Sequence, residues 1–257
     1  AEQLKGSLIF DVPPCFADNP NLPEDFPRIW SWHQPKGEVA SKSDLQKIHQ
    51  QLAAHAVHFR GDAIKIVAWA DCHEESLPVL ELYKNQGPPL VAFAQGSGGL
   101  ASRLWALSLG APWTYACWKG EATALGQCSE QDVRKRQEWR GAKLFGVMGD
   151  PVEHSRSPLL WNTAFRWLSA NGDADWGNGI YLPLQHRSIT SEFLTEAYSP
   201  SEFQAFSVTA PLKLQALEAA DDASSTAQSI GAANFLLRQN GRWVAHNTDG
   251  AGALDPL

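Results

Sequence analysis

Short apolar segments that alternate with helix-forming segments run through the first half of this chain. Five of them, six or seven residues long and bounded by Pro, Gly or polar residues, are typical of buried strands: 7–12, 28–33, 63–69, 89–95 and 113–118. Helices are predicted at 44–57, 75–84 and 99–109, because apolar residues there recur at helical spacing. Strands that alternate with helices form βα units, so this half predicts a parallel sheet or barrel.

A polar helix is predicted from Ser129, and the short polar stretch Arg140–Lys143 follows it. We place a domain boundary there, which gives domains 1–139 and 140–257, both of the α/β class. The second domain begins with a strand at 144–148, a loop, and a helix with Ser157 as N-cap and Pro158 as first residue. Near the end, Asn240-Gly241 separates two apolar segments and predicts a type I′ hairpin.

Composition excludes several classes of function. The net charge is −7 and no Lys/Arg cluster stands out, which argues against a nucleic-acid partner. No apolar run reaches the roughly 18 residues of a membrane span. The four cysteines form no C-x-x-C pair, so we expect no metal site, no disulfide framework and a cytoplasmic location. The first residue is not Met and no secretory signal follows, so we expect an excerpt of a longer protein.

Lys65 and His33 form the first candidate pair of catalytic residues. Lys65 lies inside the apolar strand AIKIVAW, where desolvation favours the neutral amine that can attack a ketone and form a Schiff base. His33 ends the preceding strand, and the carboxyl ends of parallel barrel strands meet at one mouth. From these residues alone, other interpretations stay open: a lone strand histidine is more often a structural group, and a strand lysine can simply extend to solvent.

Four segments resemble the type I 3-dehydroquinate dehydratases in order and spacing, over about residues 7–130. They are IWSWHQ, DAIKIVAW, PPLVAFAQGSGGLASRLWALSLGAPWTYACW and EATALGQ. The resemblance implies the last five strands of a (βα)₈ barrel. It implies that Lys65 forms an imine with 3-dehydroquinate, without a cofactor, and that His33 moves the proton and helps to expel water. It also implies that Arg103 binds the substrate carboxylate, and that Thr123 and Gln127 lie on a closing loop.

Two features of the second half are ambiguous when read alone. Ser155 and Ser157 precede a helix, where hydroxyls and free N–H groups suit a carboxylate, although ordinary helix capping needs the same residue types. Lys213 and Asp249 could form an acid–base pair, or each could be a surface charge.

The motifs GDPVEHSRSP, SVTAPLK, GAAN and NTDG together resemble the substrate-binding domain of shikimate dehydrogenases. The resemblance implies that Ser155 and Ser157 hold the shikimate carboxylate and that Lys213 with Asp249 handles the proton. The substrate's ring hydroxyls would contact three further residues together with Asp249: Thr209, Asn234 and Thr248. NADP is the implied cofactor, but we assign no cofactor-binding residue, because the chain has no phosphate-binding glycine loop of the dinucleotide type.

The combined hypothesis is a bifunctional enzyme of the shikimate pathway in aromatic amino acid biosynthesis. The dehydratase product, 3-dehydroshikimate, is the substrate of the dehydrogenase, so the expected partners are small ring acids. Quinate fits the same residues as shikimate. One alternative is another Schiff-base barrel such as a class I aldolase. A second is a truncated or degenerate shikimate-binding module without catalysis.

Overall fold

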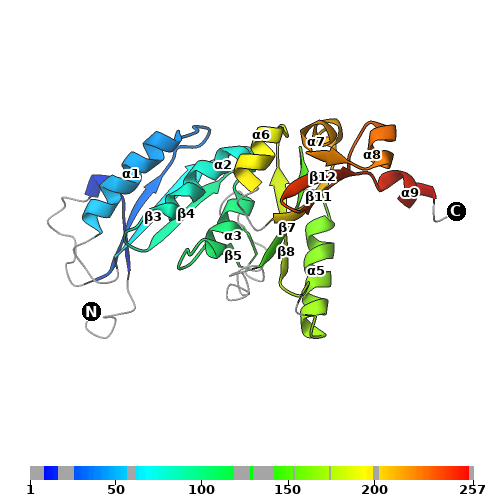
Figure 1. Cartoon of the computed structure of the whole chain (residues 1–257). Coiled ribbons are helices and arrows are strands. Elements are labelled where there is room, and N and C mark those ends of the chain that lie inside the picture. The colour runs from blue at the N-terminus through cyan, green and yellow to red at the C-terminus, as the bar shows by residue number, and fades with distance from the viewer. Residues whose placement is uncertain are drawn as a thin grey trace. The chain divides into compact units, whose positions relative to one another are not determined.

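The computed structural model describes residues 9–16, 26–56, 62–118, 128–129, 142–152, 154–173, 175–198 and 203–254. Two compact units, Ala1–Arg136 and Gln137–Leu257, divide the chain (Figure 1). The boundary predicted after residue 139 falls outside the described residues, as does the helix predicted beyond Ser129.

The first unit contains a parallel sheet whose strands follow chain order. They are β1 (Phe10–Val12), β2 (Arg28–His33), β3 (Ala63–Trp69) and β4 (Leu90–Gln95). Its helices are α1 (Lys42–His55), α2 (His73–Leu80) and α3 (Leu100–Ser108), with 3₁₀ turns at Pro14–Phe16 and Glu81–Lys84. Helices α1 and α2 connect neighbouring parallel strands, and α3 packs beside α2, so these helices lie on one face of the sheet (Figure 1). The strands predicted at 28–33 and 63–69 are confirmed.

The central strand β3 is buried along its whole length, as a strand covered on both faces must be. Ile64 and Ile66 point to one face, and Lys65 and Val67 to the other. On this second face, Val67 packs with Val91 and Phe93, and part of the segment after α3 lies over them: Trp113 and Tyr115.

The fifth strand predicted for this half was wrong in extent and in pairing. Only β5 (Ala116–Cys117) is extended, and it pairs with β6 (Cys128–Ser129) in a separate two-stranded sheet. Residues 113 and 115 pack against the face of the four-stranded sheet instead of extending it. Within the described residues, therefore, the sheet stays open and no barrel is closed.

The second unit is a mixed sheet in the order β10-β12-β11-β9-β7-β8. The strands β7 (Lys143–Gly149), β8 (Gly179–Gln185) and β9 (Phe203–Val208) are parallel to one another. The others are β10 (Asp222–Ala223), β11 (Phe235–Gln239) and β12 (Arg242–His246). Its helices are α5 (Ser157–Ala170), α6 (Ser191–Phe193), α7 (Lys213–Ala219), α8 (Ser225–Ile230) and α9 (Asp249–Leu254), and a π-helical turn covers Leu194–Tyr198.

The hairpin between β11 and β12 confirms the turn prediction. Asn240 and Gly241 both have positive φ, 52° and 81°, as a two-residue type I′ turn requires. The antiparallel pairing then carries β12 back along β11. In the part of the chain that the structure describes, no helix is both long enough and apolar enough to cross a membrane.

Candidate active sites

The polar residues that we predicted from the sequence of the second unit lie together at one edge of its sheet. Parallel strands β7 and β9 end there, and Thr209 follows β9 directly. The antiparallel strand β11 begins at the same edge, so Asn234, just before it, lies nearby. The strand β12 ends there too and leads into Thr248 and Asp249. Carboxyl ends of parallel strands are the usual place for ligands in α/β folds.

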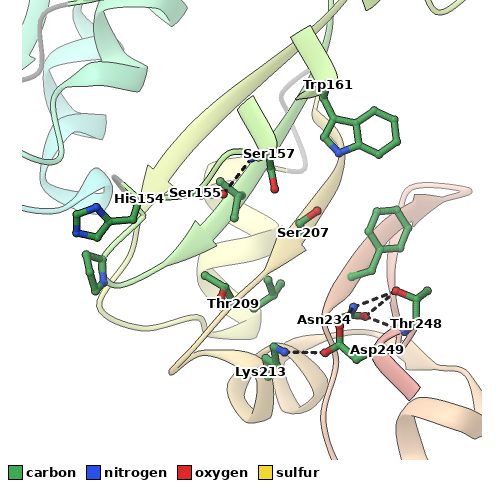
Figure 2. A pocket seen from close by; sticks show the side chains of 14 residues that line it. His154, Ser155, Ser157, Trp161, Ser207, Thr209, Lys213, Asn234, Thr248 and Asp249 are labelled. Carbon is green, nitrogen blue, oxygen red and sulfur yellow. Dashed lines mark hydrogen bonds and ion pairs between the residues drawn. The ribbon is translucent and has the colours of Figure 1, made fainter. Parts of the chain in front are cut away.

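A pocket of about 630 Å³ opens at this edge (Figure 2). The seven site residues predicted for the second half all line it: Ser155, Ser157, Thr209, Lys213, Asn234, Thr248 and Asp249. They come from a loop, from the starts of α5, α7 and α9, and from strand ends, and the fold alone brings them together.

Lys213, Asp249, Asn234 and Thr248 form a connected hydrogen-bond network at one end of the pocket. Lys213 Nζ donates to Asp249 Oδ2 at 2.6 Å, and Asn234 Nδ2 donates to Asp249 Oδ1 at 2.7 Å. Asn234 also bonds Thr248, with Nδ2 donating to Oγ1 at 2.9 Å and Oδ1 accepting from the Thr248 N–H at 2.9 Å. Both oxygens of the Asp249 carboxylate therefore have donors, which fixes its position beside Lys213 Nζ.

Ser155 and Ser157 lie at the other end of the pocket, in the loop after β7 and at the start of α5 (Figure 2). The prediction that Ser157 is the N-cap was wrong by one residue. Arg156 is the cap, with helical φ and ψ of −88° and −3°, and Ser157 is the first helical residue. The Ser157 N–H donates to Ser155 Oγ at 3.3 Å, so Ser155 supplies the capping oxygen and the Ser157 hydroxyl is left facing the pocket.

The close approach of β7 to the turn after β9 depends on a glycine. A Cβ on Gly149 would overlap the Thr209 side chain. The Thr209 N–H donates to the Met148 carbonyl at 2.9 Å, which fixes Thr209 against the end of β7. The absence of a side chain at Gly149 therefore lets Thr209 line the pocket.

Several residues near the pocket were not predicted as site residues. His154, Trp161, Ser207 and Phe235 line it, and Tyr181 lies in the cluster of core residues beside it. His154 stands inside the motif GDPVEHSRSP, which was a usable signal. Trp161 follows Ser157 by one helical turn, a spacing that places both on one face of α5.

In the first unit, the structure changes the interpretation of Lys65. Lys65 is buried on β3, as predicted, but its ammonium forms an ion pair with Asp11 on β1. Asp11 was not predicted as a site residue. The structure therefore adds an ion pair to the apolar environment that the sequence predicted for Lys65. Lys65 Nζ also lies 5.4 Å from the centre of the Tyr115 ring.

His33 and Arg103 lie near this ion pair. His33 pairs in register with Val67, two residues beyond Lys65, so both side chains are on the same face of the sheet. The His33 side chain keeps exposed surface, but partial burial of its ring lowers its pKa. The positive charges of Lys65 and Arg103 lower this pKa further, whereas the negative charge of Asp11 raises it. Arg103 is buried, with its guanidinium 4.2 Å from the centre of the Phe93 ring. Thr123 and Gln127 lie outside the described residues.

Two family models match successive parts of the chain. Residues 21–143 match "Type I 3-dehydroquinase", and residues 147–236 match "Shikimate dehydrogenase substrate binding domain". Asp11 precedes the first match, and Thr248 and Asp249 follow the second.

Relatives show the same two-part likeness. The "Bifunctional 3-dehydroquinate dehydratase/shikimate dehydrogenase, chloroplastic" of Arabidopsis thaliana is 30% identical over 80% of this chain and 34% of its own length. The "Shikimate dehydrogenase (NADP(+))" of Alkaliphilus oremlandii is 36% identical over 45% of this chain and 38% of its own. A solved structure, "Dehydroquinate dehydratase and shikimate dehydrogenase from S. pombe AroM", is 23% identical, with a TM-score of 0.40, over 96% of this chain and 47% of that one.

This chain therefore spans little more than a third of either curated relative. The two family matches follow one another with only a few residues between them, and the Arabidopsis relative aligns with most of the chain. Successive segments of the chain thus match the type I 3-dehydroquinase family and the shikimate dehydrogenase substrate-binding family.

Proposed function

We propose that this chain belongs to an enzyme that performs two consecutive steps of the shikimate pathway. The first is dehydration of 3-dehydroquinate, and the second is NADP-linked reduction of 3-dehydroshikimate to shikimate. The observation that carries the proposal is the pocket of the second unit, where seven residues chosen from sequence motifs line one cavity.

The two ends of this pocket match the two ends of a shikimate-like ring acid. Ser155 and Ser157 offer hydroxyl donors at the start of α5, where free N–H groups and the helix dipole favour an anion. The opposite end offers an ammonium, a carboxylate and an amide, which can donate to and accept from ring hydroxyls. A carboxylate at the serine end therefore directs the oxygen-bearing ring carbons toward Lys213 and Asp249.

Lys213 and Asp249 are the groups that would exchange a proton with the reacting oxygen. Asp249 holds the Lys213 ammonium at 2.6 Å, and Asn234 holds the other carboxylate oxygen. A proton on Lys213 can pass to the ketone oxygen in reduction and return from the hydroxyl in oxidation. Because both side chains remain partly exposed, at 37% and 52%, a substrate can reach them.

The described residues do not fit a dinucleotide. Gly250 and Gly252 are the closely spaced glycines that follow β12. Both lie within α9 instead of in a loop before the helix, so they do not form the glycine-rich turn that binds a pyrophosphate in dinucleotide folds. We place NADP binding on other residues and assign this chain only the substrate and proton roles.

For the dehydratase step, Lys65 would attack the substrate ketone and release water as the imine forms. The Lys65 ammonium must first lose a proton, and Asp11, already in contact with it, can accept that proton. His33, on the same face of the sheet, would then move the proton from the adjacent carbon to the leaving hydroxyl group, which departs as water while a carbon–carbon double bond forms, and its lowered pKa keeps it neutral for the first part of that task. Hydrolysis of the imine would consume the water released in its formation and free Lys65. Arg103 would bind the substrate carboxylate.

The test is calorimetric titration of the 257-residue chain with shikimate. We expect saturable binding, and we expect Ser157→Ala to weaken it by about ten- to a hundredfold, the effect of losing one hydrogen bond to a charged group. Ser169→Ala, an exposed serine in the last turn of the same helix, is the matched control and should bind like the wild type. Circular dichroism must show that α5 is intact in both variants.

If the folded wild-type chain ignores shikimate, the proposal fails. Binding without turnover, measured with NADP in the complete protein, would favour the degenerate binding module instead. Equal binding of quinate would widen the substrate class to both ring acids. A cytoplasmic location is likewise a proposal, and the Arabidopsis relative is named as chloroplastic.

A further inference from the structure

Tyr181 on β8 lies beside the serine end of the pocket, since its ring stacks on Trp161, which lines the pocket with Ser157. Its ring is 5% exposed and packs in the core with Phe145, Phe165 and Val147. The hydroxyl oxygen is buried, and no well-aligned hydrogen bond to it is present among the described residues. Burial raises the pKa of Tyr181, while the nearby Ser207 and Ser157 hydroxyls lower it, so these two serines lie beside the phenol.

The position of this ring is fixed from two sides. Asn162 on α5 brackets the Tyr181 backbone, because Asn162 Nδ2 donates to the Tyr181 carbonyl at 2.9 Å and Asn162 Oδ1 accepts from the Tyr181 N–H at 2.9 Å. Trp161, which lines the pocket, stacks on the ring with centroids 6.2 Å apart and planes 14° apart. A buried hydroxyl held this firmly, yet without a well-aligned partner, calls for an explanation in terms of function.

A hydroxyl group has one proton to give. When Ser157 or Ser207 donates that proton to a bound carboxylate, its oxygen can still accept a hydrogen bond from behind. Tyr181 is the donor in place to supply it, since its raised pKa keeps the phenol protonated at neutral pH. Hydrogen bonds in such a chain polarise one another, and an anion at the end of the chain strengthens them.

We propose that Tyr181 is a positioning residue for the carboxylate end of the pocket, donating its hydroxyl proton to Ser157 or Ser207 when that serine binds a ring carboxylate. This inference rests on the proposed function. It assigns selectivity for the ionised carboxylate to a residue that does not itself line the pocket. It also gives Ser207 a role in anion binding, which the sequence motifs did not indicate.

The test compares shikimate with its methyl ester, in which the carboxylate is neutral, by calorimetry on the full chain. We expect Tyr181→Phe to weaken shikimate binding by about three- to tenfold, as for a typical single hydrogen bond, and to leave ester binding within about twofold. Tyr198→Phe is the matched control, because it removes another buried phenol of the same unit, one that bonds His186 at 2.7 Å. That variant should lose stability without changing the preference for shikimate over the ester.

A double-mutant cycle of Tyr181→Phe with Ser207→Ala provides the second arm. If Tyr181 acts through Ser207, the double variant should lose less shikimate affinity than the two single losses combined. Equal weakening of shikimate and ester would assign Tyr181 a purely structural role and overturn the inference. So would unchanged shikimate binding by the folded Tyr181→Phe chain. Wild-type chain that does not bind shikimate would refute the proposed function, and this inference would fall with it.

Discussion

The two units hold their candidate residues in different ways. In the second unit, residues from six separate segments line one pocket, and four of them form a hydrogen-bond network. In the first unit, Lys65, His33 and Arg103 gather on one face of an open four-stranded sheet, where Lys65 contacts a carboxylate. A pocket at strand ends needs only a few neighbouring elements, whereas a barrel mouth needs strands from all around the ring.

The two candidate lysines, Lys213 and Lys65, also differ in the solvent exposure of their ion pairs. Lys213 and Asp249 are both partly exposed, so the pair is solvated and accessible. Lys65 is 7% exposed, and its partner Asp11 is the more exposed member at 45%. The ion pair of the first unit is therefore less accessible at its lysine than the ion pair of the second unit.

The largest expected effect concerns Lys65. In the complete dehydratase, borohydride reduction in the presence of 3-dehydroquinate should attach the substrate to Lys65, because this lysine is buried beside His33. Lys65→Ala should abolish the adduct, as found by peptide mass mapping. Lys84→Ala, an exposed lysine of the same unit, is the control and should label normally. An adduct on another lysine would remove Lys65 from the mechanism.

The next effect concerns Lys213 in the dehydrogenase step. In the complete protein with NADP, Lys213→Ala should lower kcat by about 10²- to 10⁴-fold with a much smaller change in KM, as expected for a group that acts in the transition state. Lys143→Ala, a lysine of the same unit that does not line the pocket, should leave kcat unchanged. Near-normal kcat in Lys213→Ala would show that the ion pair with Asp249 is only structural.

The sequence predicted most elements and the composition of one site. Buried strands such as 28–33 and 63–69 are continuous apolar segments, and the Asn240-Gly241 turn has few alternatives. Asp11 and Tyr181 were missed because their roles come from pairing between strands: Asp11 contacts a lysine 54 residues away. The cap at Ser157 was misplaced because Ser155 supplies the oxygen instead. Local patterns carry no information on such contacts.

A smaller effect is expected in the titration of His33. Its pKa should lie below 6.5, because partial burial and the Lys65 and Arg103 charges disfavour the imidazolium. The unfolded chain then binds more protons between the folded pKa and 6.5, so His33 destabilises the fold as the pH falls through that window. In NMR titrations, Lys65→Met should raise the pKa of His33 and Asp11→Asn should lower it further. His49, whose pKa is lowered by burial alone, should not change.

The smallest expected effect tests whether the second unit is self-sufficient. Every described residue that lines its pocket belongs to Gln137–Leu257. Residues 137–257 alone should therefore bind shikimate within about twofold of the whole chain, a difference of roughly 0.4 kcal/mol. A much larger loss, with circular dichroism showing a folded unit, would mean that the first unit contributes to the site.

A crystal structure of the chain with shikimate is the decisive measurement, since it shows where the ring acid lies and which way it points. We predict that the carboxylate lies against Ser155 and Ser157, with the ring hydroxyls toward Lys213, Asn234 and Asp249. Shikimate bound elsewhere in this unit, or bound with its carboxylate against Lys213, would contradict it.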